Sequence, residues 1–215
     1  MKSVLLIGLG RFGRNTAIKL KELKHEVMAV DIIEERVADI LPYVSNALIG
    51  DATNPTFLET LGVKDYDLCI VTIGDNFQAS LEVTSLLKEM GAKRVISRAS
   101  RGIQKKFLLR NGADDVVYPE EQVAQWTAVR YSSDHIFDYL TIEDGYSIVE
   151  IDVPIRWIGK TIGELDIRNK YKLNIMAVKN ESTISMQITN NTQFSGTEKL
   201  LVLGKDADIQ KCFLN

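Results

Sequence analysis

The stretch Val4-Leu5-Leu6-Ile7-Gly8-Leu9-Gly10-Arg11-Phe12-Gly13 decides the fold of this chain. Four apolar residues predict a buried strand, and a G-x-G-x-x-G spacing follows directly, at the start of a segment with helical period. In this context Gly8 permits a tight turn, Gly10 lets a phosphate approach the backbone, and Gly13 allows helix and strand to pack. The helix N-terminus then offers free N–H groups to an anion. The alternative is that the three glycines serve only the turn.

Composition excludes several classes of protein. The chain has 215 residues, of which 45% are hydrophobic, so it is long and apolar enough to bury a core. With 26 Lys+Arg against 29 Asp+Glu the formal net charge is −3, which favours neither nucleic acid nor an anionic membrane as a partner. Cys69 and Cys212 form neither a disulfide framework nor a metal-ligand pattern. No apolar run approaches the ~20 residues of a spanning helix, so we expect a soluble, cytoplasmic protein.

Short apolar runs alternate with longer helical segments over the first half of the chain. This order is typical of βαβ units wound into a parallel sheet, and the nearly unbroken apolar runs suit a sheet that is covered on both faces. We therefore predict an α/β fold with a Rossmann-type, doubly wound parallel sheet. The predicted strands are Ser3–Ile7, Glu26–Val30, Asn46–Ile49, Leu68–Thr72, Arg94–Ser97 and Asp115–Tyr118.

The pattern changes after Pro119. A helix over residues 120–131 is followed by the acidic, turn-rich stretch 132–146, which we interpret as a linker. We predict a nucleotide-binding domain over residues 1–118, a crossover helix and linker over 119–145, and a small α+β module over 146–215. The elements predicted in this module are strands at 148–153, 175–178, 184–188 and 200–203, and helices at 162–170 and 206–214.

Acidic and basic residues follow the predicted strands, where ligands of open α/β sheets bind. Asp31 lies 18 residues after Gly13, at the place of the carboxylate that accepts ribose hydroxyls, although it could instead cap the next helix. Asp51 is suited to an adenine amino group and Arg98 to a phosphate, and Gly74 leaves space for a ligand. For Asp51, as for Asp75, a helix cap is an equally simple interpretation.

The chain resembles the regulatory subunits of bacterial Ktr/Trk potassium-uptake systems, also called RCK or KTN domains. The residues that carry the resemblance in the first domain include Gly50-Asp51-Ala52-Thr53, the stretch 71–76, Gly112-Ala113-Asp114 and Tyr118-Pro119-Glu120, besides the glycine motif and Val30-Asp31. In the smaller module they are the stretches 146–150 and 162–165. Together they span nearly the whole chain, and they identify its halves as RCK N-terminal and C-terminal domains.

The resemblance implies a cytosolic, non-enzymatic subunit that senses a nucleotide and gates potassium flux. Such subunits form homodimers that assemble into an octameric ring on a membrane-embedded potassium translocator, at the inner face of the cell membrane. ATP and ADP are the expected ligands, with NAD or NADH as the alternative. The cofactor-binding residues are then Gly8, Gly10, Arg11, Phe12, Gly13, Asp31, Asp51, Ala52, Thr72, Gly74 and Arg98.

Three further roles come from the resemblance alone. Arg11 matches a residue that reaches the terminal phosphate of a nucleotide held by the neighbouring subunit, and an uncompensated cation in a first helical turn is itself slightly costly. Glu120 matches an acid that holds Mg²⁺ or Ca²⁺ at the subunit interface, although an acid is favourable at a helix start without a metal. Arg168 and Asn174 match a segment that binds cyclic di-AMP across a dimer interface, and the alternative is a solvated helix end.

Two other functions compete with this one. An NAD-dependent oxidoreductase needs a substrate domain with a general acid or base, and residues 146–215 contain no histidine. A transcription factor with a Rossmann half needs a basic helix-turn-helix, which the sequence does not show. We therefore expect no catalysis and no nucleic-acid partner.

Overall fold

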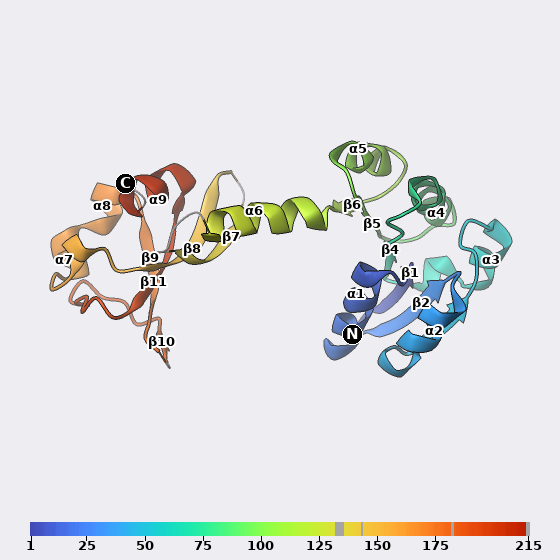
Figure 1. The fold of residues 1–215 in the computed structure, drawn as a ribbon, viewed down its shortest axis with the longest axis horizontal. Helices are drawn as coiled ribbons and strands as arrows, with labels where there is room; N and C mark the ends of the chain where they lie inside the picture. The colour runs from blue at the N-terminus through green and yellow to red at the C-terminus, as the bar shows by residue number, and fades with distance from the viewer. Residues whose placement is uncertain (132–135, 143, 182, 214–215) are drawn as a thin grey trace. The chain divides into compact units, whose positions relative to one another are not determined.

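The computed structural model describes residues 1–131, 136–142, 144–181 and 183–213, which form two units, Met1–Glu121 and Gln122–Asn215. The first unit is a six-stranded parallel sheet in the order β3-β2-β1-β4-β5-β6 (Figure 1). Its strands are β1 (Ser3–Ile7), β2 (Glu26–Asp31), β3 (Asn46–Ile49), β4 (Leu68–Val71), β5 (Val95–Arg98) and β6 (Asp115–Val117). Its helices are α1 (Arg11–Glu22), α2 (Glu34–Ile40), α3 (Pro55–Thr60), α4 (Phe77–Glu89) and α5 (Gly102–Arg110). This confirms the predicted doubly wound sheet.

Both faces of this sheet are covered, which explains the apolar runs. In β1, Val4 and Leu6 pack with Ala17 of α1 and Ile40 of α2. The intervening residues of the same strand, such as Leu5, turn to the opposite core, which includes side chains of α3 and α4. Val4, Leu5, Leu6 and Ile7 of β1 are therefore all buried, on one side or the other, and an alternating polar pattern would be unfavourable here.

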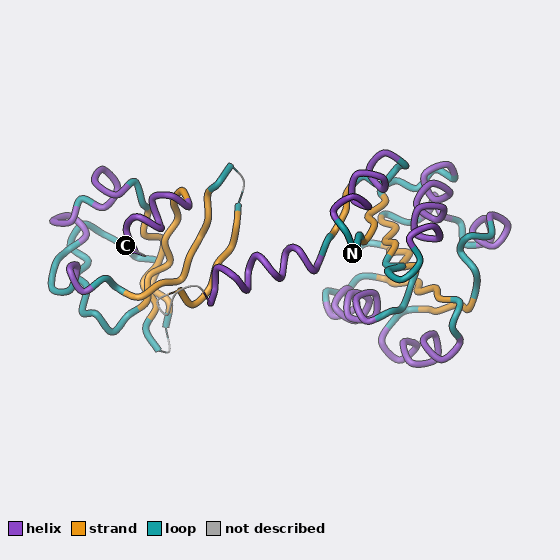
Figure 2. The backbone as a smooth tube through the Cα atoms, turned by 45° about the horizontal axis from the view of Figure 1, so that its top comes forward, coloured by secondary structure: helices purple, strands orange, loops and turns teal. Residues whose placement is uncertain are grey.

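The second unit has a five-stranded antiparallel sheet in the order β10-β9-β11-β8-β7. Figure 2 draws these strands in orange. Its core surrounds Trp157, which is fully buried and stacks on Phe194 with ring centroids 5.9 Å apart. The helix α6 (Pro119–Tyr131) begins in the first unit and ends in the second. The remaining elements are β7 (Ile136–Thr141), β8 (Tyr146–Asp152), α7 (Ile162–Leu165), α8 (Ile167–Tyr171), β9 (Asn174–Lys179), β10 (Ile184–Ser185), β11 (Lys199–Lys205) and α9 (Asp206–Phe213).

Three local predictions for the second unit need correction. The stretch 132–146 is not a linker throughout, because β7 lies within it and pairs with β8; residues 132–135 and 143 lie outside the described residues. The single helix predicted at 162–170 is two short helices, since Asp166 adopts a left-handed conformation (φ 46°) between them. The strand predicted at 184–188 ends at Ser185. The terminal helix is described up to Phe213, so the end predicted for it lies outside the described residues.

None of the described helices has both the length and the apolar character needed to cross a bilayer. Cys69 and Cys212 are buried free thiols, one in each unit. Burial raises the pKa of the Cys69 thiol to about 12, so this thiol stays protonated in the folded protein.

Candidate functional site

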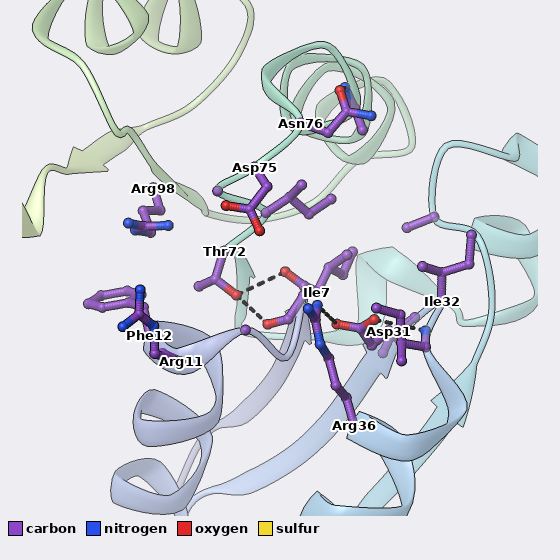
Figure 3. A pocket seen from close by; sticks show the side chains of 18 of the residues that line it. Ile7, Arg11, Phe12, Asp31, Ile32, Arg36, Thr72, Asp75, Asn76 and Arg98 are labelled. Atoms are coloured by element: carbon purple, nitrogen blue, oxygen red, sulfur yellow. Dashed lines mark hydrogen bonds and ion pairs between the residues drawn. The ribbon is translucent and has the colours of Figure 1, made fainter.

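A cleft with a volume of ≈ 860 Å³ lies at the carboxyl ends of the strands of the first unit (Figure 3). The sheet order reverses between β1 and β4, and open α/β sheets bind ligands beside such a reversal. The structure brings to this cleft every candidate cofactor residue of the first unit except Gly13, together with Glu120. Gly13 is buried and packs against Gly8 and Thr72 of the lining.

The three glycines of the loop have different structural roles. Gly8 has φ +99°, a conformation that L side chains rarely adopt. A Cβ on Gly13 would lie 2.0 Å from the carbonyl oxygen of Gly8 and 2.4 Å from Thr72 Oγ1, so α1 approaches the residues that follow β1 and β4 too closely for a side chain. A Cβ on Gly10 would meet nothing within 4 Å, although Gly10 lines the cleft. The open space therefore lies where a phosphate would approach the backbone.

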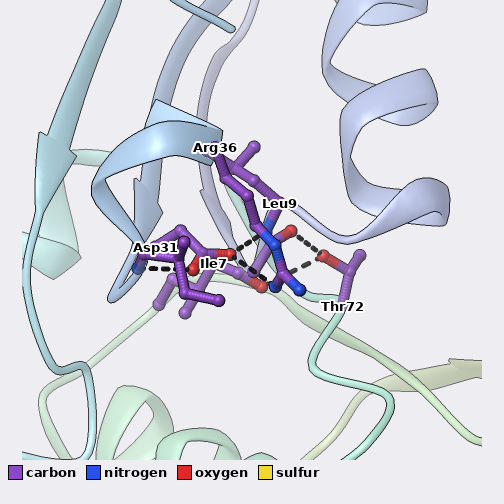
Figure 4. Close-up of polar contacts among 7 residues, drawn as sticks. Ile7, Leu9, Asp31, Arg36 and Thr72 are labelled. Atoms are coloured by element: carbon purple, nitrogen blue, oxygen red, sulfur yellow. Dashed lines mark hydrogen bonds and ion pairs between the residues drawn. The ribbon is translucent and has the colours of Figure 1, made fainter. Parts of the chain in front are cut away.

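Thr72 positions the loop from the neighbouring strand. Its buried hydroxyl lies 3.1 Å from the carbonyl oxygen of Ile7 and 2.5 Å from that of Gly8 (Figure 4). Because a hydroxyl donates one proton, these two acceptors occupy its donor capacity. Thr72 thus holds the turn in place and offers a ligand only acceptor capacity.

Asp31 is joined to the same loop. Its carboxylate accepts hydrogen bonds from the backbone N–H of Leu9 at 2.5 Å and of Ile33 at 2.9 Å, and only 6% of the residue is exposed (Figure 4). The helix-cap interpretation is wrong, because α2 begins at Glu34 with Ile33 as its N-cap. A carboxylate has about four acceptor positions, so two backbone bonds leave capacity for ribose hydroxyls.

The N-terminus of α1 faces the cleft without an internal partner. Gly10 caps the helix without any side-chain hydrogen bond, and the first turn carries no acid. The first backbone N–H groups of a helix have no intrahelical acceptor, and the helix dipole adds positive potential there. Arg11 is exposed in this turn, and both Arg11 and Phe12 line the cleft. These groups together favour an anion.

The acids after β3 and β4 do not cap helices. Asn54 caps α3 and Asn76 caps α4, each by accepting a backbone N–H. Asp51 instead accepts hydrogen bonds from the N–H and hydroxyl of Thr53 through one oxygen, at 2.9 and 2.7 Å. Asp51, Asp75 and the buried Ala52 all line the cleft. The cap interpretation is therefore wrong for both aspartates.

Arg98 and Glu120 form an ion pair at the far side of the cleft. The Nη2 atom of Arg98 lies 2.5 Å from Oε1 of Glu120, which is in the first turn of α6. A Cβ on Gly74 would lie 1.9 Å from Nη1 of Arg98, so Gly74 provides the space that this guanidinium occupies. Within the described ranges no group of three or more His, Cys, Asp or Glu residues surrounds a potential metal position. Glu120 alone does not form a closed metal site in one subunit.

Arg36 is a cleft residue that sequence reasoning missed. It lies on α2, and its Nη1 atom is 3.5 Å from Oδ2 of Asp31 (Figure 3). The available signal was its place in the sequence, since Arg36 is a basic residue in the first turn of the helix that follows the acid of β2. Its side chain is 42% exposed, so the guanidinium remains accessible to a ligand.

Arg168 and Asn174, the pair predicted for cyclic di-AMP, contact each other in the second unit. The Nε and Nη2 atoms of Arg168 donate to Oδ1 of Asn174 at 3.0 and 2.7 Å. The contact joins α8 to β9 and holds the guanidinium in a defined orientation at an exposed position.

Two domain families cover most of the chain. Residues 4–119 match the TrkA-N domain and residues 146–213 match the TrkA-C domain. Among solved structures, the chain is similar to the GsuK channel bound to NAD, with a TM-score of 0.69 and 18% identity over 96% of this chain. The chain spans 38% of that channel chain, and this likeness shows the fold alone.

Two curated relatives are similar over nearly their whole length. The Ktr system potassium uptake protein C of Bacillus subtilis is 37% identical over 98% of this chain and 95% of its own. The Ktr system potassium uptake protein A of the same organism is 34% identical over the same shares of the two chains. These matches confirm the resemblance and the role in potassium uptake that were predicted from the sequence. On the strength of both domain matches and both relatives, the chain belongs to the Ktr/Trk family of potassium uptake proteins.

Proposed function

We propose that this protein is the nucleotide-sensing regulatory subunit of a potassium-uptake system. The observation that carries the proposal is the glycine loop at the free N-terminus of α1, which is open at Gly10 and is held by the carboxylate of Asp31 at the edge of the cleft. The phosphates would lie against the backbone N–H groups of the loop, and the ribose would lie at Asp31. The potassium uptake relatives support the link from this cleft to ion transport.

The ligand we propose is an adenine nucleotide. ATP and ADP are the first candidates, and NAD or NADH is the alternative, which the likeness to a channel bound to NAD supports. Arg11 would read the terminal phosphate of a nucleotide in the neighbouring subunit, because its side chain is exposed in the anion-favouring turn of α1. An arginine offers a charge-assisted, bidentate contact there.

Several finer proposals follow from the resemblance. The protein would act in the cytoplasm as homodimers within an octameric ring, docked on a membrane-embedded potassium translocator. Glu120 would contribute a hard oxygen ligand to Mg²⁺ or Ca²⁺ between subunits, with the other ligands coming from elsewhere in the ring. Cyclic di-AMP would bind to two copies of the second unit, where the oriented Arg168 suits a phosphate on a two-fold axis.

We propose regulation rather than catalysis. Hydride transfer, the chemistry of the alternative oxidoreductase, needs a general acid or base beside the nicotinamide. The described lining of the cleft contains no His, Cys, Lys or Tyr, so Asp and Glu carboxylates are the general acids or bases that it offers. The proposal of regulation is supported by the curated relatives, which are potassium uptake proteins.

A pair of substitutions at Gly10 tests the nucleotide site. Gly10 has φ −62°, which any residue adopts, and its Cβ position is open, so Gly10→Asp and Gly10→Asn should both fold. Both side chains are favourable N-caps, but only Asp places a negative charge where the phosphate would lie. We expect Gly10→Asp to weaken ATP, ADP and NAD binding in calorimetry by at least tenfold more than Gly10→Asn does, at equal thermal stability. Equal affinity of the two variants for all three ligands would contradict the proposed site.

A further inference from the structure

The ion pair between Arg98 and Glu120 joins two parts of the first unit with different roles. Arg98 is the last residue of β5, and Glu120 is the second residue of α6, the helix that continues into the second unit. Both residues line the cleft, so their contact lies where a ligand would be bound. The arginine side chain is 18% exposed and the glutamate side chain is 53% exposed. The carboxylate is thus the more accessible partner and the easier one to displace.

The surroundings of Arg98 hold it in the cleft with unused hydrogen-bonding capacity. Its Nη1 atom occupies the space left by Gly74, and its guanidinium lies 5.8 Å from the ring centroid of Phe12, at the start of α1 (Figure 3). Its Nε atom is buried and has no partner among the described residues. A guanidinium has five N–H donors in a planar fork that matches carboxylate and phosphate oxygens alike.

We propose that Glu120 is an internal competitor of the nucleotide for Arg98. In the nucleotide-free subunit the carboxylate holds the guanidinium, and a phosphate oxygen replaces that carboxylate when nucleotide binds. The exchange leaves Glu120 free at the first turn of α6. Arg98 is then the residue that couples an occupied cleft to the start of the connecting helix. This inference rests on the proposed nucleotide site, and it adds a contact at the start of α6 that changes when nucleotide binds.

The exchange has a thermodynamic consequence. A ligand shifts an equilibrium only through contacts that differ between the two states. A nucleotide phosphate would have to displace Glu120, whereas adenosine, which has no phosphate, would leave the ion pair intact. Removing the charge of Glu120 should therefore raise the affinity for the nucleotide relative to that for the nucleoside. This gain should require Arg98.

A calorimetric double-mutant cycle on the full-length chain tests this coupling. ADP and adenosine are titrated into the unsubstituted chain, Glu120→Gln, Arg98→Gln and the double variant, in low salt with EDTA. Glu121→Gln is the matched control, because Glu121 lies in the same helical turn and belongs to none of the described ion pairs. It corrects for the general effect of removing one negative charge near an anion.

We expect Glu120→Gln to raise ADP affinity by about twofold to fivefold relative to Glu121→Gln, the range that corresponds to partly exposed ion pairs. The affinity for adenosine should not change. When Arg98→Gln is also present, Glu120→Gln should change the ADP affinity no more than Glu121→Gln does. The inference is overturned if Glu120→Gln and Glu121→Gln act equally on ADP, or if the gain persists without Arg98. Failure of the unsubstituted chain to bind ADP, ATP or NAD would overturn the proposed function as well.

Discussion

At the scale of single residues, Asp31 combines a structural task with a proposed binding task. Its buried carboxylate accepts backbone N–H groups from the glycine loop and from the start of α2, so it fixes the loop geometry on which phosphate binding depends. Removing it would leave the N–H groups of Leu9 and Ile33 without this acceptor. A buried donor without a partner costs about 1–3 kcal/mol.

Asp31→Ala should therefore affect both affinity and stability. We expect ATP, ADP and NAD binding to weaken alike by about 1.5–3 kcal/mol, the scale of charge-assisted hydrogen bonds, because all three ligands carry the same adenosine ribose. Calorimetric titrations measure the affinities, and scanning calorimetry measures the loss of stability. An unchanged affinity for all three nucleotides would show that Asp31 serves the loop alone.

At the scale of elements, the contact of α1 with β1 and β4 depends on Gly13. A methyl group there would overlap the Gly8 carbonyl oxygen at 2.0 Å, and backbone cannot move aside as a flexible side chain can. We expect Gly13→Ala to destabilise the first unit by about 1–3 kcal/mol and to weaken nucleotide binding, since it displaces α1 from the loop. Gly10→Ala is the matched control, because its methyl group meets nothing within 4 Å. Scanning calorimetry that finds the two alanine variants equally stable would contradict this account of the packing.

A second element-scale prediction concerns the turn before β11. The carboxylate of Glu198 accepts the backbone N–H groups of Ser195, Gly196 and Thr197 at 2.7, 3.0 and 3.0 Å. Burial acts to raise the pKa of this carboxyl, but the hydrogen bonds from Ser195 and its neighbours outweigh it and hold the pKa below 4.5. The charged form therefore stabilises the fold above an unfolded-state pKa of 4.5, and this contribution is lost as pH falls through the lowered folded-state pKa.

Tryptophan fluorescence measures this effect, because both tryptophans, Trp126 and Trp157, lie in the second unit. Glu198→Gln should lower the stability of that unit at pH 7 by about 1–3 kcal/mol. The difference between the variant and the unsubstituted chain should shrink below pH 4.5. If the difference is the same at pH 7 and at pH 3.5, the charge of Glu198 does not carry the contribution.

An element can be predicted from the sequence when the contacts that form it are local, and it is missed when they join residues far apart in the chain. The strands of the first unit and the glycine loop follow from local apolar runs and glycine spacing, and the structure confirms them. β7 was missed because its place depends on pairing with β8, and Asp138 interrupts its apolar pattern. The contacts of Asp31 with Leu9 and of Arg98 with Glu120 each span 22 residues. No local pattern predicts such partners, although Asp31, Arg98 and Glu120 were each recognised as candidates.

At the scale of the whole molecule, the chain combines two units with separate candidate sites. The first unit has the cleft in which we propose that an adenine nucleotide binds, and the second has the exposed Arg168–Asn174 pair, at which we propose that a symmetric dianion binds. The helix α6 belongs to both units and begins at the ion pair that we propose to break on binding. In a ring of such subunits, nucleotide binding would release Glu120 from Arg98 at the first turn of α6 in every copy.

Native mass spectrometry tests the central claim most directly, because one spectrum reports both the bound ligand and the number of subunits. The full-length chain is measured as purified, after nucleotide removal, and after addition of ATP, ADP or NAD, with Gly10→Asp as the control. The account predicts an even-numbered assembly of up to eight subunits, in which each subunit gains the mass of one adenine nucleotide and the Gly10→Asp subunits need at least tenfold more nucleotide to gain it. Unliganded subunits at saturating concentrations of all three nucleotides would contradict it.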